Sequence, residues 1–222
     1  MTNGALLVDL DGTLVDTAPD MVAALERLCR RNGRTAPDRD LARAVVSSGS
    51  MALLRLGFGD EEASARRDEL LPAFLADYTA NVAQSSALFA GWDRVLEYVE
   101  SRGVRWGVVT NKPEHISRKL LAELELAERC GCIIGGDTLS VRKPHPEPLL
   151  VAADSLNANP SSSLYVGDHQ RDIDAGQAAG MRTIAAAWGY IVDGDGADRW
   201  GADHVIDSPA DLLALLFERS VA

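Results

Sequence analysis

The part of this chain after residue 100 alternates between short apolar runs and longer stretches with helical spacing. Strands are expected at 104–109, 133–134, 163–166, 183–186 and 204–206. Helices are expected at 114–126, 147–156, 171–179 and 209–219. Alternation of this kind implies right-handed crossovers, and therefore a parallel sheet with helices on both faces. The run Ala5-Leu6-Leu7-Val8 has the character of a further strand that is buried on both faces.

The segment between this first run and residue 89 has a different pattern, which is helical. A helix begins at Thr17-Ala18-Pro19-Asp20, where a proline lies early in the first turn. Further helices are expected at 38–46, 50–56 and 60–82, and one more at 92–102. We therefore predict an α/β fold, a Rossmann-like doubly wound parallel sheet with an inserted α-helical cap domain. The predicted division assigns residues 1–16 plus 89–222 to the core and residues 17–88 to the cap.

The balance of charges limits the class of partner. The chain has 22 Lys and Arg against 33 Asp and Glu, a formal net charge of −11, which argues against nucleic acid or an anionic membrane. No apolar run approaches the ~18 residues that a membrane span needs, and no secretion signal is evident. Cys29, Cys130 and Cys132 lack a scaffold spacing, so we expect reduced thiols in a cytoplasmic protein.

Two carboxylates follow the first predicted strand, in the sequence Asp9-Leu10-Asp11-Gly12-Thr13. At positions i and i+2 of an extended chain, Asp9 and Asp11 point to the same side. Neighbouring ionised carboxylates repel each other unless a cation or a shared proton relieves them. The pair therefore suits either a divalent metal or a division into nucleophile and acid/base. Taken alone, the pentapeptide is equally compatible with a strand that ends in an ordinary Asp-Gly turn.

Polar side chains also follow the later strands. They are Thr110 and Asn111 after the second strand, Lys143 near the third, and Asp168 and Asp172 after the fourth. Each alone has an ordinary explanation as a helix cap, a turn or a surface residue. In a parallel sheet, however, ligands bind beyond the carboxyl ends of the strands, and all of these residues fall at that edge. Four carboxylates, a lysine and a hydroxyl suit Mg²⁺ together with a phosphoryl group.

Lysine is rare in this arginine-rich chain and occurs only at positions 112, 119 and 143. Two of the three lysines, Lys112 and Lys143, precede a proline. An ammonium is a compact point charge, whereas a guanidinium is a planar fork, so the two bind differently. The pattern is compatible with a need for a compact ammonium at one of these two places, and equally with chance among only three lysines.

In these motifs the chain resembles the haloacid dehalogenase-like phosphohydrolases that carry a helical cap after the first strand. The resemblance covers essentially the whole chain. It implies that Asp9 is the nucleophile and becomes an aspartyl-phosphate, while Asp11 protonates the leaving oxygen and then activates water. It implies phosphate-binding residues at Thr110, Asn111 and Lys143, and Mg²⁺ ligands from Asp9, the backbone carbonyl of Asp11, Asp168 and Asp172.

Within this family the residues favour a simple phosphatase. The dehalogenases lack the second aspartate, whereas Asp11 is present. Phosphonoacetaldehyde hydrolysis needs a cap lysine, and the sugar phosphomutases tend to use cap lysine and histidine; residues 17–86 contain neither type. The layout resembles phosphoglycolate phosphatases. Three sequence segments resemble those of a bacterial subgroup that includes N-acetylmuramic acid 6-phosphate phosphatases. They are Trp106-Gly107-Val108-Val109-Thr110-Asn111-Lys112-Pro113, Gly189-Tyr190-Ile191 and Trp200-Gly201-Ala202-Asp203.

We therefore predict a Mg²⁺-dependent phosphomonoester hydrolase, a monomer or homodimer. Its predicted substrate is a small phosphorylated metabolite, phosphoglycolate or a sugar phosphate such as N-acetylmuramic acid 6-phosphate. Candidate cap residues that face the leaving group are Ser47, Ser48, Gly49 and Ser50, although an ordinary helix–helix joint explains them equally well. The alternatives are a phosphatase of another sugar phosphate or a nucleotide, and a non-catalytic scaffold that binds a partner. A phosphoacceptor signalling domain would be much shorter and would lack the insertion.

Overall fold

Six parallel strands form a single sheet in the order β5-β4-β1-β6-β7-β8. The computed structural model describes residues 3–191 and 196–218. The strands are β1 (Leu6–Val8), β4 (Trp106–Val109), β5 (Ile133–Ile134), β6 (Leu164–Gly167), β7 (Arg182–Ala186) and β8 (His204–Ile206). The central strand β1 pairs in parallel with both β4 and β6. The predicted α/β fold with a parallel sheet is confirmed.

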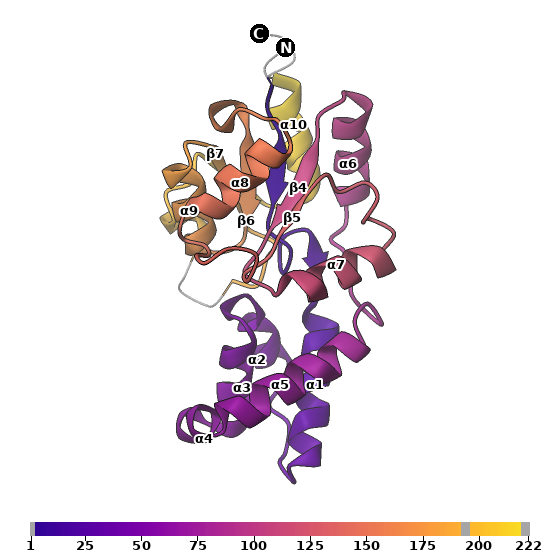
Figure 1. Cartoon of the computed structure of the whole chain (residues 1–222), viewed down its shortest axis with the longest axis vertical. Helices are drawn as coiled ribbons and strands as arrows, with labels where there is room; N and C mark the ends of the chain where they lie inside the picture. The colour runs from indigo at the N-terminus through magenta and orange to yellow at the C-terminus, as the bar shows by residue number, and fades with distance from the viewer. Residues whose placement is uncertain (1–2, 192–195, 219–222) are drawn as a thin grey trace.

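Helices cover both faces of this sheet (Figure 1). On one face lie α6 (Trp92–Ser101), α7 (Glu114–Glu123) and α10 (Leu212–Glu218); on the other lie α8 (Glu147–Ser155) and α9 (Gln170–Ala178). Successive side chains of β1 point to opposite faces, so Leu6 and Val8 join the first apolar layer and Leu7 joins the second. All three are buried, which explains why this strand is continuously apolar.

Five helices form a separate lobe, which lies below the sheet in Figure 1. They are α1 (Ala18–Arg31), α2 (Arg39–Ala44), α3 (Ser50–Phe58), α4 (Asp60–Ala65) and α5 (Arg67–Ala80), and we call them the helical insert. The short 3-10 turns are η1 (Val46–Ser48) in the insert, and η2 (Pro160–Ser162), η3 (Ala197–Arg199) and η4 (Pro209–Asp211) elsewhere.

The insert packs around a buried apolar centre. Leu25 of α1, Leu53 of α3 and Phe74 of α5 are fully buried, and they belong to the same apolar cluster as Leu6 of the sheet. The two lobes are therefore joined by continuous apolar packing. Among residues 3–191 and 196–218, no helix has both the length and the apolar character required to cross a bilayer.

The structure differs from the sequence prediction chiefly in two places. The helix predicted at 60–82 is two helices, because Arg66 leaves helical geometry and Asp68 and Glu69 begin a new first turn, where acidic residues are favourable. The two connections between the sheet lobe and the insert pair as a two-stranded antiparallel sheet of β2 (Val15–Asp16) and β3 (Ala87–Leu88), which we did not predict. Strands of two residues are too short to show an alternating pattern. The closing helix was predicted to reach residue 219, which lies outside the described residues.

Candidate active site

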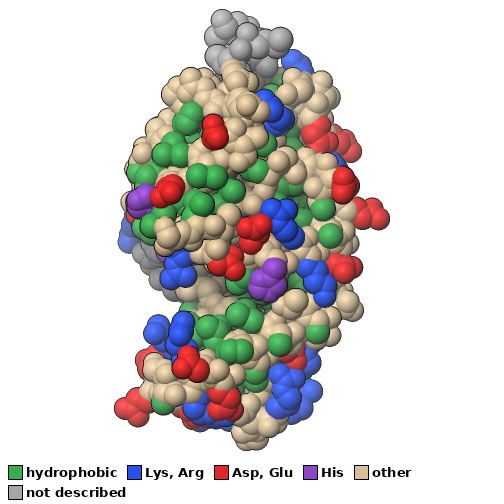
Figure 2. All heavy atoms as spheres, viewed as in Figure 1, with side chains coloured by type: hydrophobic (Ala, Val, Ile, Leu, Met, Phe, Trp, Pro, Cys, Tyr) green, Lys and Arg blue, Asp and Glu red, His purple; other side chains and the backbone are tan. Residues whose placement is uncertain are grey.

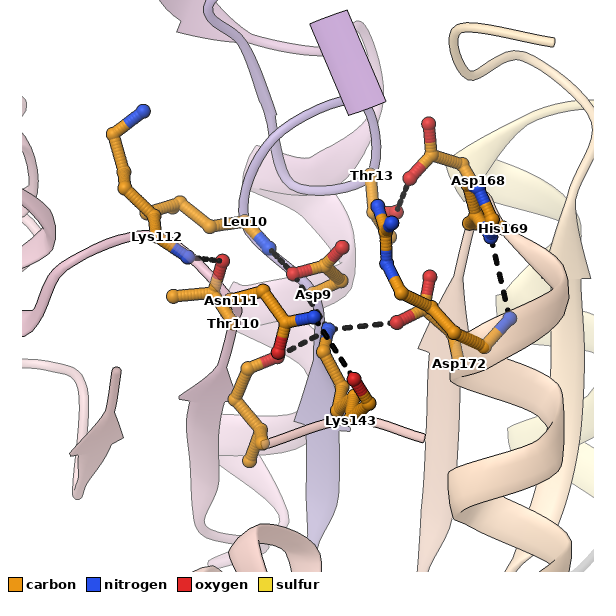
Figure 3. Close-up of polar contacts among 12 residues, drawn as sticks. Asp9, Leu10, Thr13, Thr110, Asn111, Lys112, Lys143, Asp168, His169 and Asp172 are labelled. Atoms are coloured by element: carbon orange, nitrogen blue, oxygen red, sulfur yellow. Dashed lines mark hydrogen bonds and ion pairs between the residues drawn. The ribbon is translucent and has the colours of Figure 1, made fainter. Parts of the chain in front are cut away.

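The residues that follow β1, β4 and β6 meet at the carboxyl edge of the sheet, as Figure 3 shows. Asp9 lies at the end of β1, Thr110 at the end of β4 and Asp168 at the end of β6. Because β4 and β6 are the two neighbours of β1, their ends flank Asp9 on either side. The parallel topology thus brings together residues that are 58 to 159 positions apart in the chain.

A buried lysine connects two of the carboxylates. The Nζ atom of Lys143 lies 2.9 Å from Oδ1 of Asp9 and 2.7 Å from Oδ1 of Asp172. It also donates hydrogen bonds to the Tyr165 hydroxyl at 2.7 Å and to the Val109 carbonyl at 2.9 Å. Burial alone would lower the pKa of Lys143, but the charges of Asp172 and Asp9 outweigh it and raise that pKa. The ammonium is therefore a fixed positive charge beside Asp9.

Three carboxylates form a compact buried group. Asp9, Asp168 and Asp172 each offer an oxygen, and these oxygens all lie within 4.8 Å of one another. Burial, together with the charges of Asp9 and Asp172, raises the pKa of Asp168 to about 7. Oδ2 of Asp172 is buried and accepts no hydrogen bond within the described part of the chain. A divalent cation would relieve both the repulsion and the unpartnered oxygen, so the donor set fits a hard metal ion.

Asp168 is held by three hydrogen bonds from different parts of the fold. The Thr13 hydroxyl donates to its Oδ1 at 3.1 Å, and the Ser47 hydroxyl and the Tyr190 backbone N–H donate to its Oδ2 at 2.6 and 3.0 Å. Gly12 is needed for this approach: it has a φ of +83°, and a Cβ there would lie 2.1 Å from Oδ2 of Asp168. The conformation of the Asp9–Thr13 turn and the position of Asp168 are thus fixed together.

The side chain of Asp11 does not join this carboxylate group. Its Oδ1 accepts a hydrogen bond from the Thr17 hydroxyl at 2.6 Å and lies 2.8 Å from Nζ of Lys112. Burial would lower the pKa of Lys112, but Asp11 raises it above the ordinary lysine value. The two aspartates of the Asp-x-Asp motif therefore have different surroundings, which two different chemical roles require. A metal contact through the backbone carbonyl of Asp11 stays a prediction.

Thr110 and Asn111 lie beside Asp9 in the same cavity. The Thr110 hydroxyl accepts a hydrogen bond from the Lys112 backbone N–H at 3.2 Å. The Asn111 amide donates to the Lys143 carbonyl at 3.0 Å, which ties the end of β4 to the loop that carries Lys143. The Oδ1 atom of Asn111 is buried with no partner among the described residues. Thr110 and Asn111 therefore line the cavity together with Asp9, and their binding of phosphate stays a prediction.

The cavity lies between the two lobes and has a volume of about 340 Å³. The sheet lobe contributes Asp9, Asp11, Thr110 and Asn111 to its wall. The insert contributes all four predicted cap residues, Ser47, Ser48, Gly49 and Ser50, and an apolar stripe of Met51, Leu71, Leu75 and Tyr78. A cavity of this size is ordinary for a small-molecule site. That the four cap residues contact a leaving group stays a prediction.

Sequence reasoning missed several charged residues of this cavity. Arg67 comes from α5, Arg142 precedes Lys143, and Arg171 lies in the first turn of α9, whose start is capped by His169. The guanidinium of Arg171 donates to the Ser47 carbonyl of the insert. Among the charged residues of the cavity that were not predicted as site residues, only Lys112 carried a signal, because lysine is rare in this chain. Figure 2 shows Lys and Arg side chains on both sides of the notch between the lobes.

Comparison with known proteins agrees with this geometry. The model of the haloacid dehalogenase-like hydrolase family matches residues 6–186. A phosphoglycolate phosphatase of Xanthomonas campestris pv. campestris is 44% identical over 208 residues, which are 94% of each chain. An N-acetylmuramic acid 6-phosphate phosphatase of Pseudomonas putida is 41% identical and covers 96% of this chain and 95% of its own. The crystal structure of a predicted phosphoglycolate phosphatase from Haemophilus somnus superposes with a TM-score of 0.86 at 25% identity, covering 97% of this chain and 99% of its own.

Proposed function

Because this chain belongs to the haloacid dehalogenase-like hydrolases, we propose that Asp9 is the nucleophile of its phosphomonoesterase reaction. The enzyme is a phosphomonoesterase of the phosphoglycolate phosphatase type. The observation that supports the role of Asp9 is its ion pair with the buried Lys143, while Asp9 itself lines the cavity. This pair holds the carboxylate in one orientation beside a cation that the phosphoryl oxygens would share.

The proposed reaction has two steps. First, a carboxylate oxygen of Asp9 forms a bond to phosphorus, the bond from phosphorus to the ester oxygen breaks, and Asp11 gives its proton to that departing oxygen. Second, a water oxygen bonds to phosphorus, its proton goes to Asp11, and the bond between Asp9 and phosphorus breaks to release phosphate. The separate surroundings of Asp9 and Asp11 support this division of roles.

Phosphate binding is assigned to residues around Asp9. Thr110 has its hydroxyl hydrogen available as a donor, because its oxygen accepts from the Lys112 N–H. Lys143 supplies the fixed charge. Asn111 holds the loop that carries Lys143 through its amide, and it lines the cavity beside Asp9.

The carboxylate group of Asp9, Asp168 and Asp172 is proposed to hold Mg²⁺, with the Asp11 carbonyl as a further ligand. When bound, the ion would supply positive charge that offsets the phosphoryl oxygens and the carboxylates. The buried, unpartnered Oδ2 of Asp172 and the raised pKa of Asp168 support this assignment. A cation would give the oxygen a partner and would offset the repulsion between the carboxylates that raises the pKa.

For the substrate, we propose a phosphomonoester whose leaving group carries a carboxylate, namely phosphoglycolate or N-acetylmuramic acid 6-phosphate. The cavity is lined by Arg67, Lys112, Arg142 and Arg171, although the whole chain has a net charge of −11. The side chain of Arg142 forms no ion pair within the described residues, and that of Arg67 is 60% exposed with only a 3.6 Å contact to Asp68. Two arginines thus remain to bind a carboxylate, which a guanidinium recognises in a bidentate way.

The insert is proposed to act as a cap that excludes water from this chemistry. Its predicted limits, residues 17 and 88, lie next to the β2–β3 joints. Closure over the cavity would protect the aspartyl-phosphate until the hydrolytic water is placed. A cytoplasmic location and a monomeric or homodimeric state stay predictions.

The test is phosphate release from a substrate panel in the presence of Mg²⁺, with Asp9→Asn as the blank. The panel contains phosphoglycolate, N-acetylmuramic acid 6-phosphate, N-acetylglucosamine 6-phosphate and a nucleoside monophosphate. The two amino-sugar phosphates form a matched pair, since they differ by the acidic lactyl group alone. We expect kcat/KM for the acidic member to be at least about tenfold higher, the scale of one net charged hydrogen bond. Absence of hydrolysis throughout would support a non-catalytic scaffold instead.

A further inference from the structure

Lys112 is a buried residue of the sheet lobe that contacts the helical insert. It follows β4 and Asn111, and its side chain is 5% exposed. Its ammonium lies 2.8 Å from Oδ1 of Asp11, which is the only ion pair that Lys112 forms within the described residues. Because a buried ammonium without a counter-charge is costly, the pairing strongly constrains both side chains.

Asp11 is held through one of its two oxygens. Oδ1 receives both the Lys112 ammonium and the Thr17 hydroxyl, at 2.8 and 2.6 Å. Oδ2 accepts no hydrogen bond from any described residue, and Asp11 lines the cavity. Two donors on one oxygen fix the rotation of the carboxyl group, so that the other oxygen is left for a ligand.

The rest of the surroundings of Lys112 comes from the helical insert. The ring of Tyr78, in α5, lies with its centroid 4.4 Å from the ammonium, and the sulfur of Met21, in α1, lies at 3.8 Å. Tyr78 is 1% exposed, and its hydroxyl is buried without a partner among the described residues. A cation over an aromatic face is stabilised, more so when it is desolvated. The position of the ammonium therefore depends on the insert being docked.

We propose that Lys112 is a positioning residue that orients the carboxyl group of Asp11 toward the leaving oxygen, and that Tyr78 makes this orientation depend on docking of the insert. The inference rests on the proposed role of Asp11 as the acid and base of the reaction. With Oδ1 held by Lys112 and Thr17, the proton for the ester oxygen comes from Oδ2, and the same Oδ2 takes the proton from water in the second step.

The test compares leaving groups that differ in their need for a proton. An alkyl phosphomonoester expels a strongly basic oxygen, whereas p-nitrophenyl phosphate expels a stable phenolate. The value of kcat/KM reports the first chemical step, where this difference acts. For Lys112→Met we expect kcat/KM to fall at least about tenfold more for the best alkyl substrate of the panel than for p-nitrophenyl phosphate.

The matched control is Lys119→Met. Lys119 of α7 also joins the sheet lobe to α5, since its ammonium donates to the Thr79 carbonyl at 2.6 Å, but it has no contact with Asp11. A general effect of weaker docking would appear in both lysine variants and would affect both substrates equally. We expect the selective loss in Lys112→Met alone. An equal fall for the two substrates, or the same profile in both variants, would overturn the proposal.

Two further pairs of variants keep the test decisive. Lys112→Arg retains the charge and should recover part of the alkyl activity that Lys112→Met loses, even if the methionine variant is less stable. Tyr78→Leu removes the aromatic face and should lower the alkyl-to-aryl ratio more than Tyr78→Phe, which keeps it. If Asp11→Asn itself shows no selective loss with alkyl substrates, the proposed role of Asp11 fails. If Asp11→Asn shows that loss and the Lys112 variants do not, only the present inference fails.

Discussion

The hydroxyl of Ser47 donates a hydrogen bond of 2.6 Å to Oδ2 of Asp168, across the junction of the two lobes and over 121 positions of the chain. Ser47 belongs to the helical insert, and Asp168 to the carboxylate group at the end of β6. Both residues are buried. The insert therefore contacts the proposed metal site directly, so the position of the Asp168 carboxylate depends on docking of the insert.

Replacement of Ser47 by alanine should destabilise the protein. Asp168 would lose a donor while staying buried, and above its pKa of about 7 a hydrogen bond to its ionised carboxylate contributes about 1.5–3 kcal/mol. We expect a loss of this size in the free energy of unfolding in urea, measured above pH 7 without metal. The control is Ser48→Ala, because Ser48 is an exposed neighbour whose side chain forms no hydrogen bond in the described structure. Equal stability of the two variants would contradict the prediction.

Asp9→Asn should abolish turnover and leave the fold intact. The amide is nearly isosteric with the carboxylate but is a poor nucleophile, so we expect kcat to fall by roughly 10⁴-fold or more. Phosphate release gives the rate, and circular dichroism confirms the fold. Near-normal activity in a properly folded variant would remove Asp9 from its proposed role.

Removal of divalent metal should stop hydrolysis, and Mg²⁺ should restore it. Without a cation, the three buried carboxylates repel one another and also repel the substrate. Binding to the folded state alone should also raise the melting temperature as Mg²⁺ is added. Asp172→Asn should weaken that thermal shift, because the variant loses one carboxylate of the group. Full activity in excess chelator would count against the metal assignment.

Arg142→Gln should reduce discrimination between acidic and neutral substrates. If Arg142 binds the carboxylate of the leaving group, its loss raises KM for N-acetylmuramic acid 6-phosphate by about tenfold and changes KM for N-acetylglucosamine 6-phosphate much less. Arg118→Gln is a suitable control, since this exposed arginine pairs with Glu114 outside the cavity. Equal effects on both substrates would indicate a general electrostatic role.

Asp77 should contribute to stability in a pH-dependent way. It joins α5 to α1 through Arg27 and Arg31, at 2.7 and 2.5 Å. Burial raises the pKa of Asp77, but the hydrogen bonds from the two arginines outweigh it and lower that pKa below the ordinary 3.8. Its contribution is therefore present above about pH 3.8 and is lost as the pH falls through the lower folded-state pKa.

Urea unfolding of Asp77→Asn tests this dependence. At pH 7 we expect a loss of about 1 kcal/mol, a modest value because both arginines are partly solvated. The difference from the unmodified protein should shrink below pH 3.8. Asp68→Asn, at a side chain that is 99% exposed, serves as the control. A difference that stays constant with pH would show that the ion pairs do not carry the effect.

Most of the sheet lobe could be predicted from the sequence. Continuous apolar runs marked β1 and β6, because strands covered on both faces need apolar residues at every position. The helices between them followed from the 3.6-residue spacing of apolar side chains. The two-residue strands β2 and β3 and the break at Arg66 could not be predicted, since neither leaves a periodic pattern.

The sequence by itself also determined which residues gather at the carboxyl edge of the sheet. Asp9, Thr110 and Asp168 each follow a strand directly, and parallel pairing forces strand ends to the same edge. Only the tertiary structure decided how the insert meets this edge: Ser47 against Asp168, and Tyr78 over the ammonium that holds Asp11. The physical reason is that strand ends are ordered by local sequence and topology, whereas docking of two lobes depends on contacts between distant residues, which no local pattern records.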